Sequence, residues 1–322
     1  MDQKAVLAVD IGGTKIAAGL VGADGQVSRH AETPTPTTEL DLGEALRALL
    51  TSVAQGAAIG AVGLASAGPL DMVRGTVSPV NIPAWRDFPL VEVAGGIVPG
   101  VPVTLVGDGI AAAVGEHWLG AGRGVASMLG IVVSTGIGGG LVLNGTAYPG
   151  PSGNAGHIGH VVVDPGGPGC SCGGSGCVEA YASGPSMVRW AQEHGWAGAD
   201  ARALAADAGQ GLPLALAAFD QGTQALARGI VATATMCDLD RVVIGGGVSA
   251  AGQILFAPLR RHVRRLATLG FVRRTTVEPS MLGRQSGLLG AARTALLASQ
   301  GPVNHGTSGS QGRASALTRP AG

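Results

Sequence analysis

Net charge, long apolar runs and a secretory leader are all missing from this sequence. Lys plus Arg and Asp plus Glu both number 21 among 322 residues, and no basic run suited to a phosphate backbone occurs, so we expect no nucleic-acid partner. Apolar residues make up 46%, but Gly breaks their runs well below the roughly 18 residues that a membrane helix requires. The first residues lack the apolar stretch and cleavage site of a secretory signal. We therefore expect a soluble, cytoplasmic protein with no membrane partner.

Two common nucleotide-binding motifs are also missing. No strand runs into Gly-x-Gly-x-x-Gly with a helix behind it, and no Gly-Lys-Ser or Gly-Lys-Thr occurs. Dinucleotide binding and Walker-type phosphate binding are thus excluded, whereas phosphoryl transfer by another route stays open. Gly, by contrast, is abundant at 56 residues, and without a Gly-X-Y period we expect it in turns and ligand loops.

A unit of strand, glycine-rich loop and strand occurs twice. The first unit has strands at 5–10 and 16–21 around Asp10-Ile11-Gly12-Gly13-Thr14-Lys15, and the second has strands at 128–134 and 141–143 around Ser134-Thr135-Gly136-Ile137-Gly138-Gly139-Gly140. A plain tight hairpin explains one such loop as well as a ligand does. Two loops in matching contexts favour a nucleotide clamped between two related lobes.

The residue types in these loops suit phosphate and magnesium. Asp10 stands at a strand end directly before two glycines, where a carboxylate can hold Mg²⁺ through water while backbone amides approach phosphate oxygens. Thr135 offers a hydroxyl and Gly136 an amide to a terminal phosphate. A third loop follows the strand at 241–244, and its glycines suit a flat approach to a base or ribose. The predicted ATP and magnesium residues are Asp10, Gly12, Gly13, Thr14, Lys15, Thr135, Gly136, Gly138, Gly246 and Gly247.

Helices and strands alternate along the rest of the chain, which predicts an α/β fold. Apolar spacing predicts helices at 40–55, 110–119, 186–194, 199–208, 214–237, 253–267 and 287–299, and further strands at 61–65, 101–106 and 275–279. Asp108 follows the strand at 101–106 and precedes a helix. A carboxylate there is either a base that takes a proton from an attacking hydroxyl or a helix N-cap.

Three of the four cysteines fall within eight residues, on a segment too rich in Gly and Pro to fold on its own. Cys170, Cys172 and Cys177 together with His160 make a Cys₃His set, and a tetrahedral Zn²⁺ with no open position would organise this loop. His157 is an alternative ligand, and free thiols are the alternative interpretation of the cluster. We expect the fourth cysteine, Cys237, to be a small buried apolar residue.

Together these segments resemble the ROK family of sugar kinases and regulators, over nearly the whole chain to about Ala298. The likeness rests on 10–15, Ala67-Gly68-Pro69-Leu70-Asp71, Asn81 with Trp85, 134–140, Gly156-His157-Ile158-Gly159-His160 with the cysteine segment, and Glu179-Ala180-Tyr181-Ala182-Ser183-Gly184. The resemblance implies a two-lobed actin-like ATPase fold of the ribonuclease H-like type, with an inserted structural zinc loop. It further implies ATP and Mg²⁺ in the cleft and transfer of the γ-phosphate to a hexose hydroxyl, usually the 6-hydroxyl.

The expected domains follow from this likeness. We expect a smaller lobe over 1–120, onto which the helix at 285–299 packs back, and a larger lobe over 121–284 with the zinc loop at 157–177. The composition of 300–322 predicts a disordered tail. A homodimer is the family's usual assembly and our default expectation.

By position, the resemblance makes Asp108 the catalytic base and assigns Gly68, Asn81, His157, His160 and Glu179 to the sugar. His160 would bind zinc through its other ring nitrogen. The chain departs from the family twice, since Gly107 stands where Asn is common and His157 stands where the family's glucokinases usually have Glu.

The family's bacterial N-acetylmannosamine kinases resemble this chain from Ala155 to His160, and an imidazole there suits an N-acetyl group. We therefore predict N-acetylmannosamine as substrate, with glucose or another hexosamine as the alternative and polyphosphate as an open alternative donor. A non-catalytic sugar-sensing regulator is the alternative of another class. The family's repressors resemble this chain only after a winged-helix domain, whereas here the first strand begins at Ala5.

Overall fold

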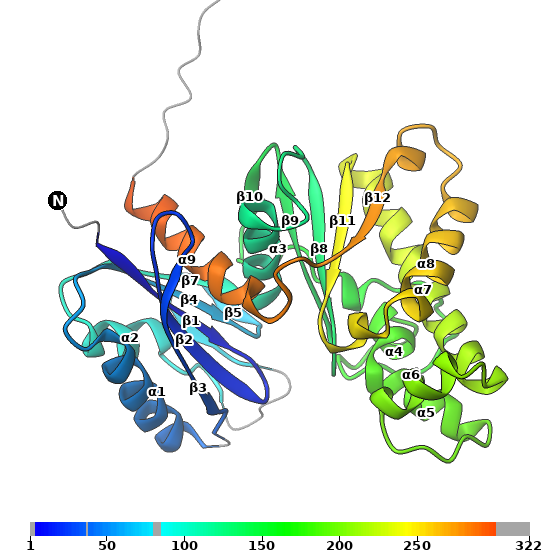
Figure 1. The fold of residues 1–322 in the computed structure, drawn as a ribbon, viewed down its shortest axis with the longest axis horizontal. Helices are drawn as coiled ribbons and strands as arrows, with labels where there is room; N and C mark the ends of the chain where they lie inside the picture. Colours follow the sequence, from blue (N-terminus) through cyan, green and yellow to red (C-terminus); the bar gives the residue numbers. More distant parts are fainter. Residues whose placement is uncertain (1–3, 37, 80–84, 301–322) are drawn as a thin grey trace, which may run out of the picture.

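Two five-stranded sheets form the frame of the molecule, in a computed structural model that describes residues 4–36, 38–79 and 85–300 (Figure 1). The N-terminal sheet has the order β3-β2-β1-β4-β7, from β1 (Ala5–Ile11), β2 (Lys15–Val21), β3 (Val27–Pro34), β4 (Ile59–Ser66) and β7 (Val103–Gly107). The C-terminal sheet has the order β10-β9-β8-β11-β12, from β8 (Met128–Val133), β9 (Ile137–Leu143), β10 (Thr146–Tyr148), β11 (Arg241–Gly245) and β12 (Thr276–Pro279).

The two sheets repeat one topology. In each, the first three strands form an antiparallel meander, and two further strands then extend the sheet in parallel from its first strand. The two strand-loop-strand units of the sequence are the hairpins β1–β2 and β8–β9, which occupy equivalent places in the two sheets. The predicted two-lobed, actin-like α/β fold is confirmed.

Helices cover both sheets. Helices α1 (Glu39–Ala54) and α2 (Leu90–Ile97) pack on one face of the N-terminal sheet, and α9 (Ser286–Ser299) packs on the other. The helix α3 (Asp108–Leu119) lies between α9 and the strands β8 and β9 (Figure 1). The far side of the C-terminal sheet carries α4 (Val178–Ala182), α5 (Gly184–Glu193), α6 (Ala201–Gly209), α7 (Pro213–Cys237) and α8 (Gln253–Leu266). Shorter pieces are β5 (Leu70–Asp71), β6 (Thr76–Val77) and the 3₁₀ turns η1 (Ile158–His160), η2 (Gly247–Ala251), η3 (Val272–Arg274) and η4 (Gly283–Gln285).

The continuous apolar run of β1 follows from burial on both sides. Leu7 and Val9 point into the core beneath α1 and α2, whereas Val6 and Ala8 point into the core beneath α3 and α9. A strand that is covered on both faces has no polar alternation, as is usual for parallel sheets between helix layers.

Glycines bring α3 into backbone contact with its neighbours, a role beyond the turns and ligand loops that we predicted for them. A Cβ at Gly115 would lie 2.2 Å from the Ser286 oxygen, and one at Gly140 would lie 2.4 Å from the Ile110 Cα. The residues Ile137–Gly140, which we predicted to belong to the second glycine-rich loop, are part of β9 and lie directly beneath α3. This close packing fixes the start of α3, and hence Asp108, beside β9.

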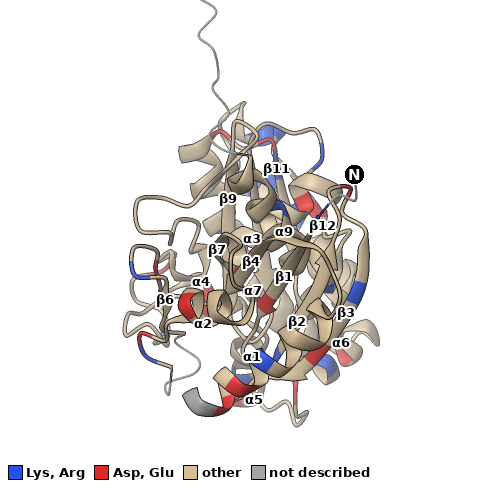
Figure 2. Cartoon of the chain, turned by 90° about the vertical axis from the view of Figure 1, so that its left-hand side faces the viewer, with Lys and Arg blue, Asp and Glu red and all other residues tan. Residues whose placement is uncertain are grey.

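Lys and Arg and Asp and Glu are both scattered along the chain in the view of Figure 2. Within residues 4–36, 38–79 and 85–300, no helix is both long and apolar enough to cross a membrane. The lobe boundaries after residues 120 and 284 stay predictions. Of the predicted tail 300–322, only Gln300, which caps α9, lies within the described residues.

Candidate functional site

Both glycine-rich hairpins expose a threonine at the tip. The amide of Gly12 donates to the Lys15 oxygen at 3.0 Å, which leaves Gly13 and Thr14 exposed at the end of the β1–β2 turn. The amide of Ser134 donates to the Gly136 oxygen at 2.9 Å, and Thr135 is exposed. Each tip thus offers a hydroxyl and glycine backbone to a ligand, as phosphate-binding loops do.

The third glycine loop lies against the second. Gly246 has a φ of +89°, and a Cβ there would lie 2.3 Å from the Val133 oxygen, so only glycine fits. A Cβ at Gly247 would lie 3.8 Å from the Ser134 hydroxyl. The structure therefore brings the predicted phosphate residues at 135–136 and the predicted base or ribose residues at 246–247 to one end of the C-terminal sheet.

Lys15 has a partner that the sequence did not reveal. Its ammonium group pairs with the carboxylate of Glu32 on β3. It still lies close enough to Asp10 to lower the pKa of that carboxyl group. A phosphate that binds Lys15 would therefore compete with Glu32 for the ammonium group.

Asp10, on β1, and Asp108, at the start of α3, lie near one another. Burial, with the charge of Asp108 second, raises the pKa of Asp10 to about 7. Burial also raises the pKa of Asp108, against the opposing effects of the Gly109 amide and of His157. Two carboxylates with raised pKa values in one partly buried place are typical of a functional site.

Asp108 is not the N-cap of α3. Gly107 occupies the cap position, and Asp108 is the first residue of the helix. Its Oδ1 accepts a hydrogen bond from the adjacent Gly109 amide at 2.7 Å, which differs from the capping bond to the second or third helical amide. The alternative that this carboxylate is only a helix N-cap is therefore not supported.

A small cavity at the start of α3 collects several predicted residues. Gly68, Asp108, Gly138 and His157 line it, and so does Asn154, which is not among the predicted site residues. The cavity thus joins the catalytic candidate to the two predicted sugar residues Gly68 and His157 and to the second glycine loop. Asn81, a further predicted sugar residue, lies outside the described residues.

His157 is held by its own loop. Its Nδ1 lies 2.9 Å from the Asn154 carbonyl oxygen. Because a carbonyl oxygen only accepts, Nδ1 carries the proton, and Nε2 is the nitrogen left for a ligand. His157 is not in the cysteine cluster, so its alternative role as a zinc ligand is not supported.

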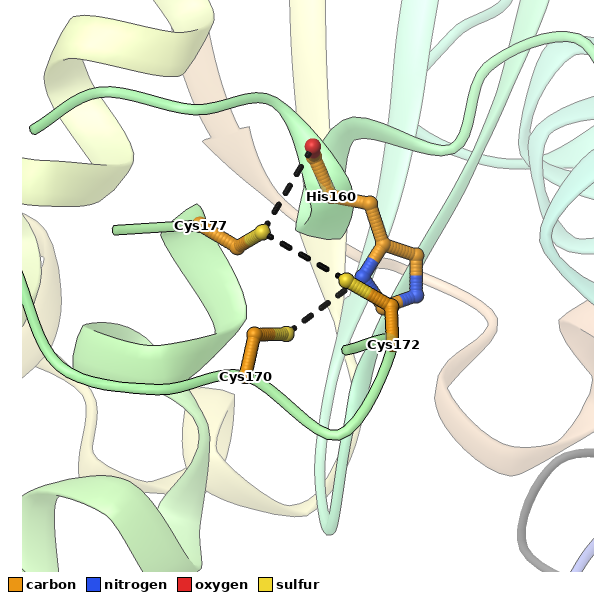
Figure 3. Close-up of side chains that lie close together, drawn as sticks. All are labelled: His160, Cys170, Cys172 and Cys177. Atoms are coloured by element: carbon orange, nitrogen blue, oxygen red, sulfur yellow. Dashed lines mark hydrogen bonds between the residues drawn. The ribbon is translucent and has the colours of Figure 1, made fainter. Parts of the chain in front are cut away.

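The predicted Cys₃His set is assembled (Figure 3). The ligand atoms of His160, Cys170, Cys172 and Cys177 all lie within 4.8 Å of one another. Cys172 Sγ is 3.8 Å from Cys177 Sγ, and Cys170 Sγ is 3.7 Å from His160 Nδ1. Bonds of about 2.3 Å to a tetrahedral zinc place sulfurs roughly 3.8 Å apart, so the cluster fits this metal. With Nδ1 on the metal, His160 Nε2 would be the nitrogen left for substrate.

Glu179 ties the zinc loop to the second glycine loop. Its Oε2 accepts from the Ile137 amide at 2.7 Å, and its Oε1 accepts from the Ser171 hydroxyl at 3.0 Å. Ser171 stands between two cysteines of the cluster, and Ile137 begins β9. The predicted sugar role of Glu179 therefore has to coexist with a structural one.

Asn154 carried no signal in the sequence because its partners are main-chain atoms far along the chain. Its side chain bonds Leu70, 84 residues away, and a main-chain partner leaves no side-chain pattern to recognise. Only the meeting of the two loops in three dimensions reveals it.

Known proteins resemble this chain over most of its length. The sequence pattern of the ROK family matches residues 6–298. A glucokinase of Thermotoga maritima is 36% identical over 310 residues, which cover 91% of this chain and 97% of that protein. An N-acetylmannosamine kinase of Escherichia coli O157:H7 is 42% identical over 250 residues, or 76% of this chain and 84% of that one.

Solved structures of ROK family proteins have the same fold as this chain. A ROK family glucokinase from Streptomyces griseus in complex with glucose and AMPPNP superposes with a TM-score of 0.80 at 34% identity, covering 91% of this chain and 99% of that one. A ROK hexokinase from Thermus thermophilus also has a TM-score of 0.80, at 36% identity. The chain therefore belongs to the ROK family and has the α/β fold of that family's sugar kinases.

Proposed function

We propose that this protein is an ATP-dependent sugar kinase that transfers the γ-phosphate of ATP to the 6-hydroxyl of a hexose or N-acylhexosamine, with N-acetylmannosamine as the favoured substrate. The observation that carries the proposal is the cavity in which Asp108 meets His157 and Gly68 beside Gly138 of the second glycine loop. A carboxylate next to both a recess lined by predicted sugar residues and a phosphate loop is what hydroxyl phosphorylation requires.

Asp108 acts as the base in this proposal. It accepts the proton of the sugar hydroxyl as the hydroxyl oxygen bonds to the γ-phosphorus and the bond to ADP breaks. The raised pKa of Asp108 makes the carboxylate a stronger proton acceptor, at the cost of a smaller ionised fraction in acid.

The rest of the proposed chemistry is binding and charge neutralisation. Asp10 lies beside Asp108 and near the exposed tip of the first glycine loop, and a carboxylate there fits Mg²⁺. Bound Mg²⁺ would neutralise charge on the phosphates of ATP. The backbone of the loops at Gly13–Thr14, Thr135–Gly136 and Gly246–Gly247 would hold those phosphates and the nucleoside, whereas the Gly12 amide is already bonded to the Lys15 oxygen.

In this proposal zinc has a structural role. The four ligands leave no open position, so the metal would fix the loop and orient His160 and, through Ser171, Glu179. The sugar would then meet His160 and Glu179 on one side and Asp108 on the other.

The identity of the sugar rests on His157. An imidazole with Nε2 available offers one hydrogen bond to a ligand and fills more space than a carboxylate, which suits an N-acetyl substituent better than two bare hydroxyls. The N-acetylmannosamine kinase relatives support this substrate. Glucose is the second candidate, because the glucokinase relatives match a larger share of the chain.

The test is a substrate panel. We would measure kcat/KM from ADP release with ATP and Mg²⁺ for N-acetylmannosamine, glucose, mannose and N-acetylglucosamine, and repeat it with polyphosphate as donor. We expect N-acetylmannosamine to be preferred and His157→Glu to move the N-acetylmannosamine to glucose ratio at least about tenfold toward glucose, with neutral His157→Gln as the matched control. Preference of the wild type for glucose would establish the second candidate. Turnover of none of the four sugars would overturn the kinase proposal.

A further inference from the structure

Two loops from different sheets meet at the rim of the cavity. One loop follows β10 of the C-terminal sheet and carries Gly153 and Asn154, and the other follows β4 of the N-terminal sheet and runs from Gly68 to Met72. A Cβ at Gly153 would lie 2.3 Å from Met72 Cγ, and a Cβ at Gly68 would lie 3.5 Å from Asn154 Oδ1. The loops are therefore in direct contact beside Asp108.

The side chain of Asn154 bonds both main-chain polar groups of Leu70. Its Oδ1 accepts from the Leu70 amide at 3.2 Å, and its Nδ2 donates to the Leu70 oxygen at 3.2 Å. A carboxamide used in this way matches a peptide group, with one donor and one acceptor in register. Any motion that parts the two loops has to break both bonds together.

The main chain of the same residue holds His157. The Asn154 oxygen accepts the Nδ1 proton of His157 at 2.9 Å. One residue thus contacts the N-terminal half of the molecule through its side chain and orients a side chain of the cavity through its carbonyl group.

From this arrangement we infer that Asn154 is a positioning residue that latches the two halves of the molecule across the sugar site and couples their closure to the orientation of His157. The inference rests on the proposed sugar-binding role of the cavity. Opening of the latch admits the sugar, and closing it holds the sugar against Asp108 with His157 in place. The latch stabilises the closed, sugar-bound form and takes no part in proton or phosphate transfer.

The expected signature is an effect on sugar binding alone. Asn154→Leu removes both bonds to Leu70 but keeps the carbonyl group that holds His157, and it should raise the sugar Kd, measured by calorimetry, and the sugar KM by about tenfold. The KM for ATP at saturating sugar should change less than twofold, because bound sugar already holds the loops together. Ser152→Ala is the matched control on the same loop, since it removes only the minor Nδ2 contact with the Ser152 hydroxyl.

A second measurement needs no variant. In the wild type, hydrogen exchange at the Leu70 amide should slow on addition of sugar, because that amide is the donor to Asn154 Oδ1. An unchanged sugar Kd in Asn154→Leu, an equal rise of the ATP KM, or no sugar-dependent protection at Leu70 would each overturn the latch. A sugar that binds and protects Leu70 without being phosphorylated would instead overturn the proposed function and leave the latch standing.

Discussion

At the scale of single residues, Asp10 gives the folded protein a pH dependence. Its pKa is raised from 3.8 to about 7, chiefly by burial and next by Asp108, so the folded state binds the proton more tightly than the unfolded state. The free energy of unfolding should therefore fall as pH rises from about 4 to 7, by about 2–4 kcal/mol, and Asp10→Asn should remove most of this fall.

Denaturant unfolding at several pH values, without Mg²⁺, tests this prediction. Asp24→Asn is the control, because Asp24 lies in the exposed turn between β2 and β3. A wild-type stability that stays level between pH 4 and 7 would contradict the raised pKa.

Asp108 is the residue on which the proposed chemistry depends. Asp108→Asn keeps the size of the side chain and removes its basicity, so we expect kcat to fall about 10²–10⁴-fold while the sugar KM changes little. The melting temperature should not fall, because a neutral amide costs less to bury than a carboxylate. Steady-state kinetics together with calorimetric sugar binding checks both statements, and turnover at the wild-type rate would show that another group takes the proton.

At the scale of elements, the loop at 160–177 depends on its metal and on Glu179. Cys172→Ser, or removal of zinc by a chelator, should loosen this loop and raise the sugar KM at least about tenfold with a smaller effect on the ATP KM. Ser171 and Glu179 connect the cluster to the start of β9. The effect on the ATP KM should be smaller because only one of the three ATP loops, at 135–136, adjoins Glu179, whereas the loops at 12–15 and 246–247 are not part of this connection. Cys237→Ser, on α7 outside the cluster, is the control.

Zinc content measured by atomic emission and hydrogen exchange over 160–177 give the readouts. Stoichiometric zinc that is lost in Cys172→Ser but kept in Cys237→Ser is the expected result. A wild-type protein that carries no zinc and still binds sugar would show that the cysteines are free thiols.

Long apolar elements were predictable from the sequence, whereas short or polar ones were not. The helix α7 and the strand β1 follow from their apolar patterns alone. The strand β3 has a mostly exposed, polar sequence at a sheet edge, and α2 contains two adjacent glycines, so neither left a clear pattern. The candidate site was likewise predictable only where the sequence carries a pattern. The spacing of the cysteines predicted the metal cluster, whereas the bond between Asn154 and the main chain of Leu70 leaves no pattern in the sequence.

At the scale of the whole molecule, both chain crossings between the two sheets pass one buried carboxylate. The crossing from α3 to β8 begins at Gly120, and the crossing from β12 to α9 runs through 280–285. Glu116, on α3, accepts from the Ala121 amide of the first crossing and from the Ser280 hydroxyl and the amides of Met281 and Leu282 of the second. Its side chain is buried, so these four bonds have little competition from water.

Glu116→Gln should therefore weaken the joint between the two sheets. A carboxamide has one oxygen where the carboxylate has two, so about half of the four donors would face an NH₂ group. We expect the free energy of unfolding to fall by about 2–4 kcal/mol and the amides of Ala121, Met281 and Leu282 to exchange faster, while Glu92→Gln on the exposed side of α2 changes neither. Thermal unfolding and site-resolved hydrogen exchange measure the two effects. If Glu116→Gln melted at the wild-type temperature with these amides still protected, the joint would be held by the packing of α3 on α9 and not by this carboxylate.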